Sequence, residues 1–136
     1  MNEPLKIKKQ IIDDILNHAR SDAPIEACGY LAGTKSLISQ AYPLSNIDKS
    51  AEHFSFSPKE QFSTLRQARN EGIEIRGVYH SHPNSPARPS PEDIKLAFDP
   101  ELIYVIVSLA AEGPGAVRAF RIIEGKVSEI TMEVIV

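Results

Sequence analysis

The sequence predicts an α/β fold, in which helices cover the faces of a mixed β-sheet. Segments with helical periodicity alternate along the chain with short segments of strand character. The run 102–109 is almost wholly apolar, which is typical of a central strand that is covered on both faces. The 136 residues are the length of one domain, so we expect a single domain over 1–136.

The composition narrows the class of protein. Hydrophobic residues make up 42% of the chain and charged residues 24%, which excludes a disordered chain or a coiled coil. The formal net charge of -3 gives no sign of nucleic-acid binding. No apolar run approaches the roughly 20 residues of a membrane helix, and the first residues show no signal segment. With Cys28 as the lone cysteine, we expect a cytoplasmic protein with neither nucleic acid nor membrane as partner.

The first helix is predicted over 7–22, where apolar residues recur at helical spacing before Pro24. The apolar segment 27–33 is predicted to be a buried strand. Residues 36–42 are expected to form its antiparallel partner, across a turn at 34–35.

A second helix is predicted over 58–70, after the polar loop 43–57. Ser57 supplies a capping hydroxyl, and proline favours the first helical position. Gly72 is expected to end this helix, and the next strand is predicted over 73–79.

The proline-rich segment 83–91 is predicted to be a loop. Ser90 repeats the capping signature, so a short helix is expected from there to about Phe98. After the central strand, alternating residues predict a strand over 117–123. A tight turn then leads into a last strand over 127–134.

Two histidines, His80 and His82, stand where the strand 73–79 ends. Side chains two apart on a strand point the same way, and paired imidazoles are good zinc ligands. Asp93 is the natural third ligand, because the first turn of a helix favours a carboxylate. The stiff loop 83–91 lowers the entropy lost in holding Asp93 there. The alternatives are a polar strand end for the histidines and a capping box for Ser90 and Asp93.

Glu26, at the head of the strand 27–33, is the candidate general base for a metal-activated water molecule. Burial would raise the pKa of this carboxyl, and a nearby metal ion would lower it. The alternative interpretation is a solvated acid in front of a strand.

These residues resemble a known family. The pattern H-x-H-P-x6-S-x2-D is filled at matching spacing by His80, His82, Pro83, Ser90 and Asp93. With Glu26 upstream, this pattern resembles the JAMM (also MPN+) zinc metallopeptidase family. The run 26–33 resembles the small bacterial and archaeal branch of that family, and the likeness extends over about 5–109.

The resemblance implies a mixed sheet related in outline to the deaminase fold. It implies that Zn²⁺ is bound by His80, His82 and Asp93, and that a zinc-bound water attacks with Glu26 as general acid/base. It assigns Ser90 to the oxyanion. Members of the family cleave amide or isopeptide bonds after the C-terminal Gly-Gly of ubiquitin-like proteins, and the compact prokaryotic members act on sulfur-carrier proteins. A homodimer is a further expectation from the resemblance.

Two other functions stay open at this point. One is a non-catalytic MPN scaffold that binds ubiquitin-like partners, although such relatives usually lack a ligand that this chain has. The other is a metal-dependent hydrolase that acts on small amides.

Four further polar residues are placed outside the predicted site. Cys28 is expected to pack within its apolar strand. His18 is expected to be solvated on the first helix. His53 is expected to belong to an ordinary polar loop, with a substrate groove as the alternative. Arg88 is the candidate contact for a substrate carboxylate.

Overall fold

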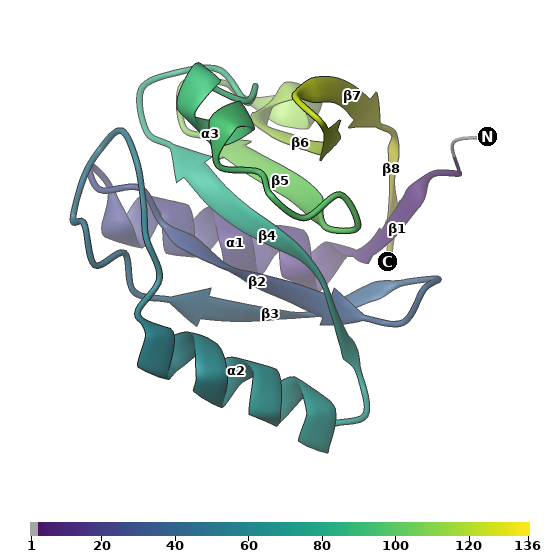
Figure 1. The fold of residues 1–136 in the computed structure, drawn as a ribbon. Coiled ribbons are helices and arrows are strands. Elements are labelled where there is room, and N and C mark those ends of the chain that lie inside the picture. The colour runs from purple at the N-terminus through teal and green to yellow at the C-terminus, as the bar shows by residue number, and fades with distance from the viewer. Residues whose placement is uncertain (1–2) are drawn as a thin grey trace.

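The computed structural model describes residues 3–136 and contains one eight-stranded sheet with helices on both faces (Figure 1). In chain order the elements are β1 (Leu5–Lys8), α1 (Lys9–Asp22), β2 (Cys28–Gly33), β3 (Ile38–Leu44), α2 (Pro58–Asn70), β4 (Glu74–His82), α3 (Pro91–Lys95), β5 (Ile103–Ser108), the 3-10 helix η1 (Gly113–Ala116), β6 (Val117–Ile123), β7 (Lys126–Ile130) and β8 (Met132–Ile135).

The sheet is mixed, as the sequence predicts. Its strand order is β7-β6-β5-β4-β2-β3-β1-β8, with β4 parallel to β5 and β1 parallel to both of its neighbours. The other pairs are antiparallel. The two edge strands, β7 and β8, are joined through Thr131, whose carbonyl accepts a hydrogen bond from the Leu5 N–H at 2.8 Å. The sheet therefore curls until its two edges are linked by a single residue.

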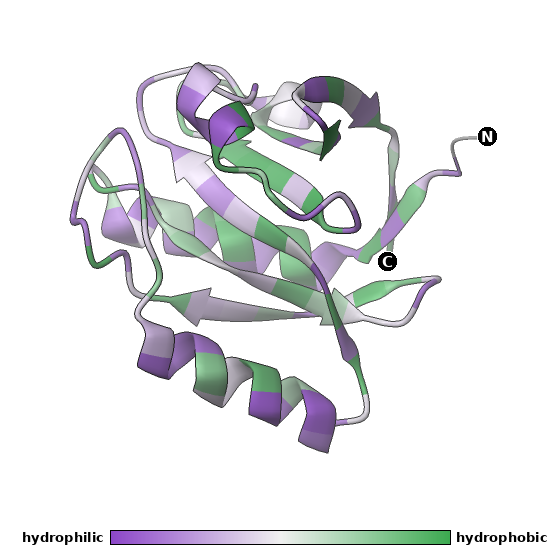
Figure 2. Ribbon diagram, viewed as in Figure 1, coloured by the Kyte–Doolittle hydropathy of each residue, from purple (hydrophilic) through white to green (hydrophobic). Residues whose placement is uncertain are grey.

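Helix α1 packs inside this curl. Its buried residues Ile11, Ile15 and Ala19 join one core with inward-facing residues such as Tyr79 and Val105. On the outer face, Ala68 of α2 joins a second core, whose sheet residues include Tyr30, Tyr42 and Val78. β5 lies between these layers and is hydrophobic along most of its length (Figure 2).

Several predicted elements match the structure closely. β6 has the predicted bounds, and β5 has the predicted burial. Ser57 caps α2 by accepting a hydrogen bond from the Glu60 N–H at 3.4 Å. Gly72 follows this helix with a φ of 73°, a conformation that favours glycine.

Three predicted boundaries are wrong, each because of strand pairing. Ile7 belongs to β1 and not to the first helix, because Leu5–Lys8 pairs with β8. The predicted last strand is two strands. Its first part, β7, pairs with β6, and after Thr131 its second part, β8, pairs with β1 at the other edge of the sheet. β4 continues to His82, since its last residues pair with β5. The helix α3 also ends earlier than expected, at Lys95.

Within residues 3–136, no helix has both the length and the apolar character needed to span a membrane.

Candidate metal centre

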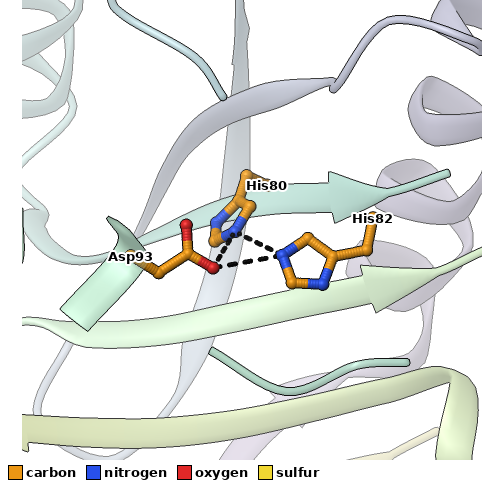
Figure 3. Close-up of side chains that lie close together, drawn as sticks. All are labelled: His80, His82 and Asp93. Atoms are coloured by element: carbon orange, nitrogen blue, oxygen red, sulfur yellow. Dashed lines mark hydrogen bonds and ion pairs between the residues drawn. The ribbon is translucent and has the colours of Figure 1, made fainter. Parts of the chain in front are cut away.

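The two histidines of β4 and the aspartate of α3 converge on one point (Figure 3). The Nε2 atoms of His80 and His82 lie 3.2 Å apart. Oδ2 of Asp93 lies 3.1 Å from each of these nitrogen atoms. The structure therefore brings together the three side chains that the sequence predicts as metal ligands.

Asp93 is positioned by the start of α3. Ser90 and Asp93 form a capping box, in which Ser90 Oγ accepts the Asp93 N–H at 3.0 Å. The Ser90 N–H in turn donates to Asp93 Oδ2 at 2.9 Å. The capping interpretation of Ser90 is therefore correct, and the hydroxyl hydrogen of Ser90 remains to be donated elsewhere.

The loop between β4 and α3 is anchored at two places. Ala87 is buried against Ile106 and Phe120 on the outer face of the sheet. The Ser108 hydroxyl donates to the carbonyl of Ser85 at 2.7 Å. These contacts fix the path of the loop and hence the distance from Asp93 to the histidines.

The histidine rings are oriented by their neighbours. His82 Nδ1 lies 2.8 Å from the carbonyl of Pro86, which can only accept a hydrogen bond. Nδ1 of His82 therefore carries a proton, which leaves Nε2, the atom that faces Asp93, to supply a lone pair when a metal ion is bound. The ring of Phe54 stacks on His80, with ring centroids 4.9 Å apart and an interplanar angle of 30°.

The donor set fits a divalent metal ion. An ion held tetrahedrally at about 2.0–2.1 Å from its ligands keeps those ligands about 3.3 Å apart. The three atom pairs here are separated by 3.1–3.2 Å. Two imidazole nitrogens and one carboxylate oxygen are also the kind of three-ligand set that leaves a fourth position free on catalytic zinc.

Asp93 is ionised in this arrangement. Burial by itself would raise the pKa of Asp93. Hydrogen bonds from His80, His82 and the Ser90 N–H outweigh this effect and hold the pKa well below its usual range. The site thus places a charged carboxylate against two imidazoles with little solvent contact, because His80 is 3% and His82 is 5% exposed.

Glu26 lies on the same face of the sheet as the histidines. β2 is antiparallel to β4, with Cys28 opposite His80, so extending the register by two residues places Glu26 opposite His82. Glu26 is only 3% exposed, and its Oε1 has no hydrogen-bond partner within residues 3–136. Burial raises the pKa of Glu26 to about 8, and the nearby Asp93 adds to the rise while His82 opposes it.

Two positioning contacts around Glu26 were not predicted from the sequence. The Ala27 N–H donates to Ser81 Oγ at 2.7 Å, and the Ala27 carbonyl accepts a hydrogen bond from the Ser81 N–H at 2.9 Å. Asn46 is buried, and its Nδ2 donates to the carbonyls of Glu26 at 3.1 Å and His53 at 3.0 Å. No local pattern marks these residues, because their partners are distant in sequence.

A cleft of about 370 Å³ opens beside His80 and Asp93. Its walls are mostly apolar and include Phe54, Phe56, Leu96, Phe98, Tyr104, Ile106 and Ile122. Phe98 is 82% exposed at the rim. The candidate metal centre therefore lies at one side of an open apolar cleft.

The residues placed outside the site have mixed outcomes. Cys28 is fully buried, and burial raises the pKa of its thiol to about 12, so the packing role is correct. The prediction of a solvated His18 is wrong, because its Nδ1 lies 2.7 Å from the Tyr79 hydroxyl oxygen and its Nε2 pairs with Asp22 at 3.0 Å. His53 lines the cleft and pairs with Asp48 at 2.9 Å.

Arg88 is exposed on the loop before α3, and its contact with a substrate carboxylate stays a prediction.

Comparisons with known sequences agree with this geometry. A family model described as prokaryotic homologs of the JAB domain matches residues 8–123. A CysO-cysteine peptidase of Mycobacterium tuberculosis (strain ATCC 25618 / H37Rv) is 32% identical over 133 residues, covering 96% of this chain and 91% of the relative. A desampylase of Haloferax volcanii is 37% identical over 103 residues, covering 71% of this chain and 74% of the relative.

Comparisons with solved structures agree as well. The solution structure of a protein from Desulfitobacterium hafniense has a TM-score of 0.88 and 40% identity, covering 96% of this chain and 92% of that one. A JAB1/MPN domain protein of Archaeoglobus fulgidus has a TM-score of 0.68 and 23% identity, covering 98% of this chain and 99% of that one. The second match shows that the fold is that of JAB1/MPN domains.

Proposed function

The chain belongs to the prokaryotic branch of the JAMM/MPN+ family and is a hydrolase of the metallopeptidase type, and from that premise we propose a specific reaction. We propose that it is a zinc-dependent isopeptidase that cleaves an amide bond after the C-terminal Gly-Gly of a ubiquitin-like or sulfur-carrier protein. A homodimer and a cytoplasmic location stay predictions from the sequence.

The observation that carries this proposal is the arrangement of four side chains on one face. His80, His82 and Asp93 present three ligand atoms within 3.2 Å of one another. Glu26 lies two residues before β2, where the extended register places it opposite His82, and its buried Oε1 has no hydrogen-bond partner among residues 3–136. Three ligands and one free carboxyl are the parts that metal-assisted hydrolysis requires.

We propose Zn²⁺ as the ion, because a set of nitrogen and oxygen donors with tetrahedral spacing suits it. When bound there, Zn²⁺ would lower the pKa of a coordinated water molecule towards neutrality and polarise a carbonyl oxygen.

Glu26 would take a proton from the attacking water and deliver it to the leaving amine. Burial raises the pKa of Glu26 to about 8 in the metal-free protein, and a bound metal ion would lower it again towards neutrality, where a carboxyl can both take and return a proton. The buried setting of Glu26 also prevents bulk water from competing for that proton.

Ser90 would donate its hydroxyl hydrogen to the oxyanion that forms on the scissile carbonyl. Its oxygen already accepts the Asp93 N–H at 3.0 Å, so the hydroxyl has a fixed place at the start of α3. A preorganised donor of this kind typically contributes about 3–4 kcal/mol to transition-state stabilisation.

The proposed substrate class rests on the relatives and on the cleft. Their names refer to CysO-cysteine in one case and to desampylation in the other. A Gly-Gly tail has no side chains and can pass close to the buried ligand residues, while the apolar walls of the cleft can receive the residues beside it. A scaffold without activity is disfavoured, because all three ligand atoms and Glu26 are in place.

The test is to incubate the zinc-loaded protein with candidate sulfur carriers that carry C-terminal extensions, and to follow their masses. We expect release of the extension after Gly-Gly, and loss of this activity with a chelator. The Glu26→Gln variant should keep its zinc and lose activity by about 10²–10⁴-fold, the usual contribution of a general acid/base. Cleavage of small amides at the same rate as carriers would instead favour the small-amide hydrolase.

A further inference from the structure

A second recess lies at the other end of the sheet from the candidate metal centre. Arg76 is near the start of β4 and His82 is at its end, so the two are separated by about 20 Å along the strand. The recess has a volume of about 330 Å³. Four basic residues line it, namely Lys6, Lys35, Arg76 and Arg121.

Arg76 points into this recess because of an irregularity in β4. In the pairing of β2 with β4, Leu31 is opposite Gly77 but Ala32 is opposite Ile75. Arg76 is therefore the extra residue of a β-bulge, which turns its side chain away from the outer face. Ile75 remains on the outer face, packed in the core beneath α2.

Arg121 is brought to the same place by the register of the next two strands. Gly77, which follows Arg76, pairs with Ile103. Extending the β5–β6 register by one residue places Arg121 beside Ile103. Ile103 belongs to the inner core and lines the recess, so both arginines flank one inward-facing position.

The positive charge of this recess is not balanced by the protein. Neither Arg76 nor Arg121 takes part in an ion pair within residues 3–136. Two acids, Glu3 and Glu129, also line the recess, but Glu129 is paired with Arg118. Cationic groups therefore exceed free carboxylates here by more than one charge.

Nε of Arg76 also lacks an acceptor among the described residues, although this nitrogen is buried. A buried guanidinium N–H without an acceptor is costly, and such groups in native proteins usually have a partner. Arg76 and Arg121 both line the recess, so an anion bound there would meet both of these cationic side chains.

We propose that this recess binds a phosphate group, either as the free ion or as the end of a small phosphomonoester. Guanidinium groups match phosphate oxygens with paired hydrogen bonds, and a dianion suits the charge excess better than a single carboxylate does. Lys6 and Lys35 add two further cationic side chains to the lining. This site is independent of the proposed hydrolytic reaction.

The test is a titration of the zinc-loaded protein with inorganic phosphate, followed by the backbone amide resonances. We expect saturable shifts at Arg76, Arg121 and Ser128, which all line the recess. Arg76→Gln or Arg121→Gln should weaken binding by roughly tenfold or more, since a hydrogen bond to a charged group is worth about 1.5–3 kcal/mol. Arg69→Gln, an exposed change of the same charge on α2, should leave the affinity unaltered.

Phosphate can also bind a zinc ion, so the residues whose amide resonances shift show which of the two sites phosphate occupies. Shifts confined to His80–His82, and lost in His82→Ala, would overturn the proposal. Equal weakening by Arg69→Gln would do the same. If Arg76→Gln does not fold, Arg121→Gln carries the test. Phenyl phosphate and acetate distinguish the ligand class, and acetate binding as tightly as both phosphates would contradict a phosphate site.

Discussion

Ser81 Oγ accepts a hydrogen bond from the backbone N–H of Ala27 at 2.7 Å, and this contact connects the two halves of the candidate site. Ser81 stands between His80 and His82, while Ala27 follows Glu26. The buried Ser81 hydroxyl therefore helps to set the position of the proposed general base relative to the ligands.

Ser81→Ala removes this acceptor and leaves the Ala27 N–H buried. We expect zinc to be retained, because no ligand changes, and kcat to fall by about 10–100-fold with little change in KM. We also expect a loss of about 1–3 kcal/mol in the free energy of unfolding. Steady-state kinetics and denaturation check both; unchanged kcat would show that Ser81 does not position Glu26. Ser57→Ala is a matched control, because the Ser57 hydroxyl also accepts a backbone N–H but caps α2, and this variant should lose stability with kcat unchanged.

His82→Ala removes one of the three proposed ligands. We expect both the bound zinc and the activity to be lost, because two remaining ligands hold the ion too weakly. His53→Ala is the control, since His53 lines the cleft but pairs with Asp48 and not with the ligand cluster. Metal analysis of the purified variants measures this, and tight stoichiometric zinc in His82→Ala would refute the ligand assignment.

Glu26 makes the stability of the metal-free protein depend on pH. The folded state raises the pKa of Glu26 from 4.5 to about 8, so folding favours the neutral carboxyl. Its contribution to stability is complete below about pH 4.5 and is lost as the pH rises through 8. With a chelator present, the Glu26→Gln variant should thus have a higher free energy of unfolding than the unmodified protein above pH 8, by no more than about 5 kcal/mol. The difference should vanish near pH 4.5.

Denaturant unfolding across this pH range measures the difference. Glu92→Gln, a change of the same charge on α3, should show a much smaller dependence. A stability difference that does not vary with pH would mean that Glu26 is ionised equally in the folded and unfolded states.

Ser90→Ala separates two roles of one hydroxyl. Loss of the cap should lower the free energy of unfolding by about 1 kcal/mol. Loss of the proposed oxyanion donor should lower kcat by about 10²–10³-fold. Ser57→Ala, at the cap of α2, is the matched control, and it should lose stability without losing kcat. If kcat falls no further in Ser90→Ala than in Ser57→Ala, the role of Ser90 is limited to capping α3.

The ligand residues could be found in the sequence because their geometry is local. His80 and His82 share a face by strand periodicity, and Asp93 is fixed by a cap whose signature is readable at Ser90. Asn46 and Ser81 could not be found in this way. Their hydrogen-bond partners come from other strands and loops, so only the folded chain identifies them.

The errors in the fold have the same origin. Ile7 and Ile11 are four residues apart, which is the spacing of one helical face, yet Ile7 belongs to a strand. The pairing of β1 with β8 overrides the local pattern, and it joins residues at opposite ends of the chain. Periodicity within one segment carries no information on such a partner.

Because of that pairing, the last residues of the chain cover one edge of β1. β8 covers the outer side of β1, from Leu5 opposite Met132 to Lys8 opposite Ile135. Removing 132–136 would uncover a row of backbone donors and acceptors, which invites another chain to add on. Removal of these residues should therefore favour self-association while leaving the arrangement of His80 and His82 unchanged.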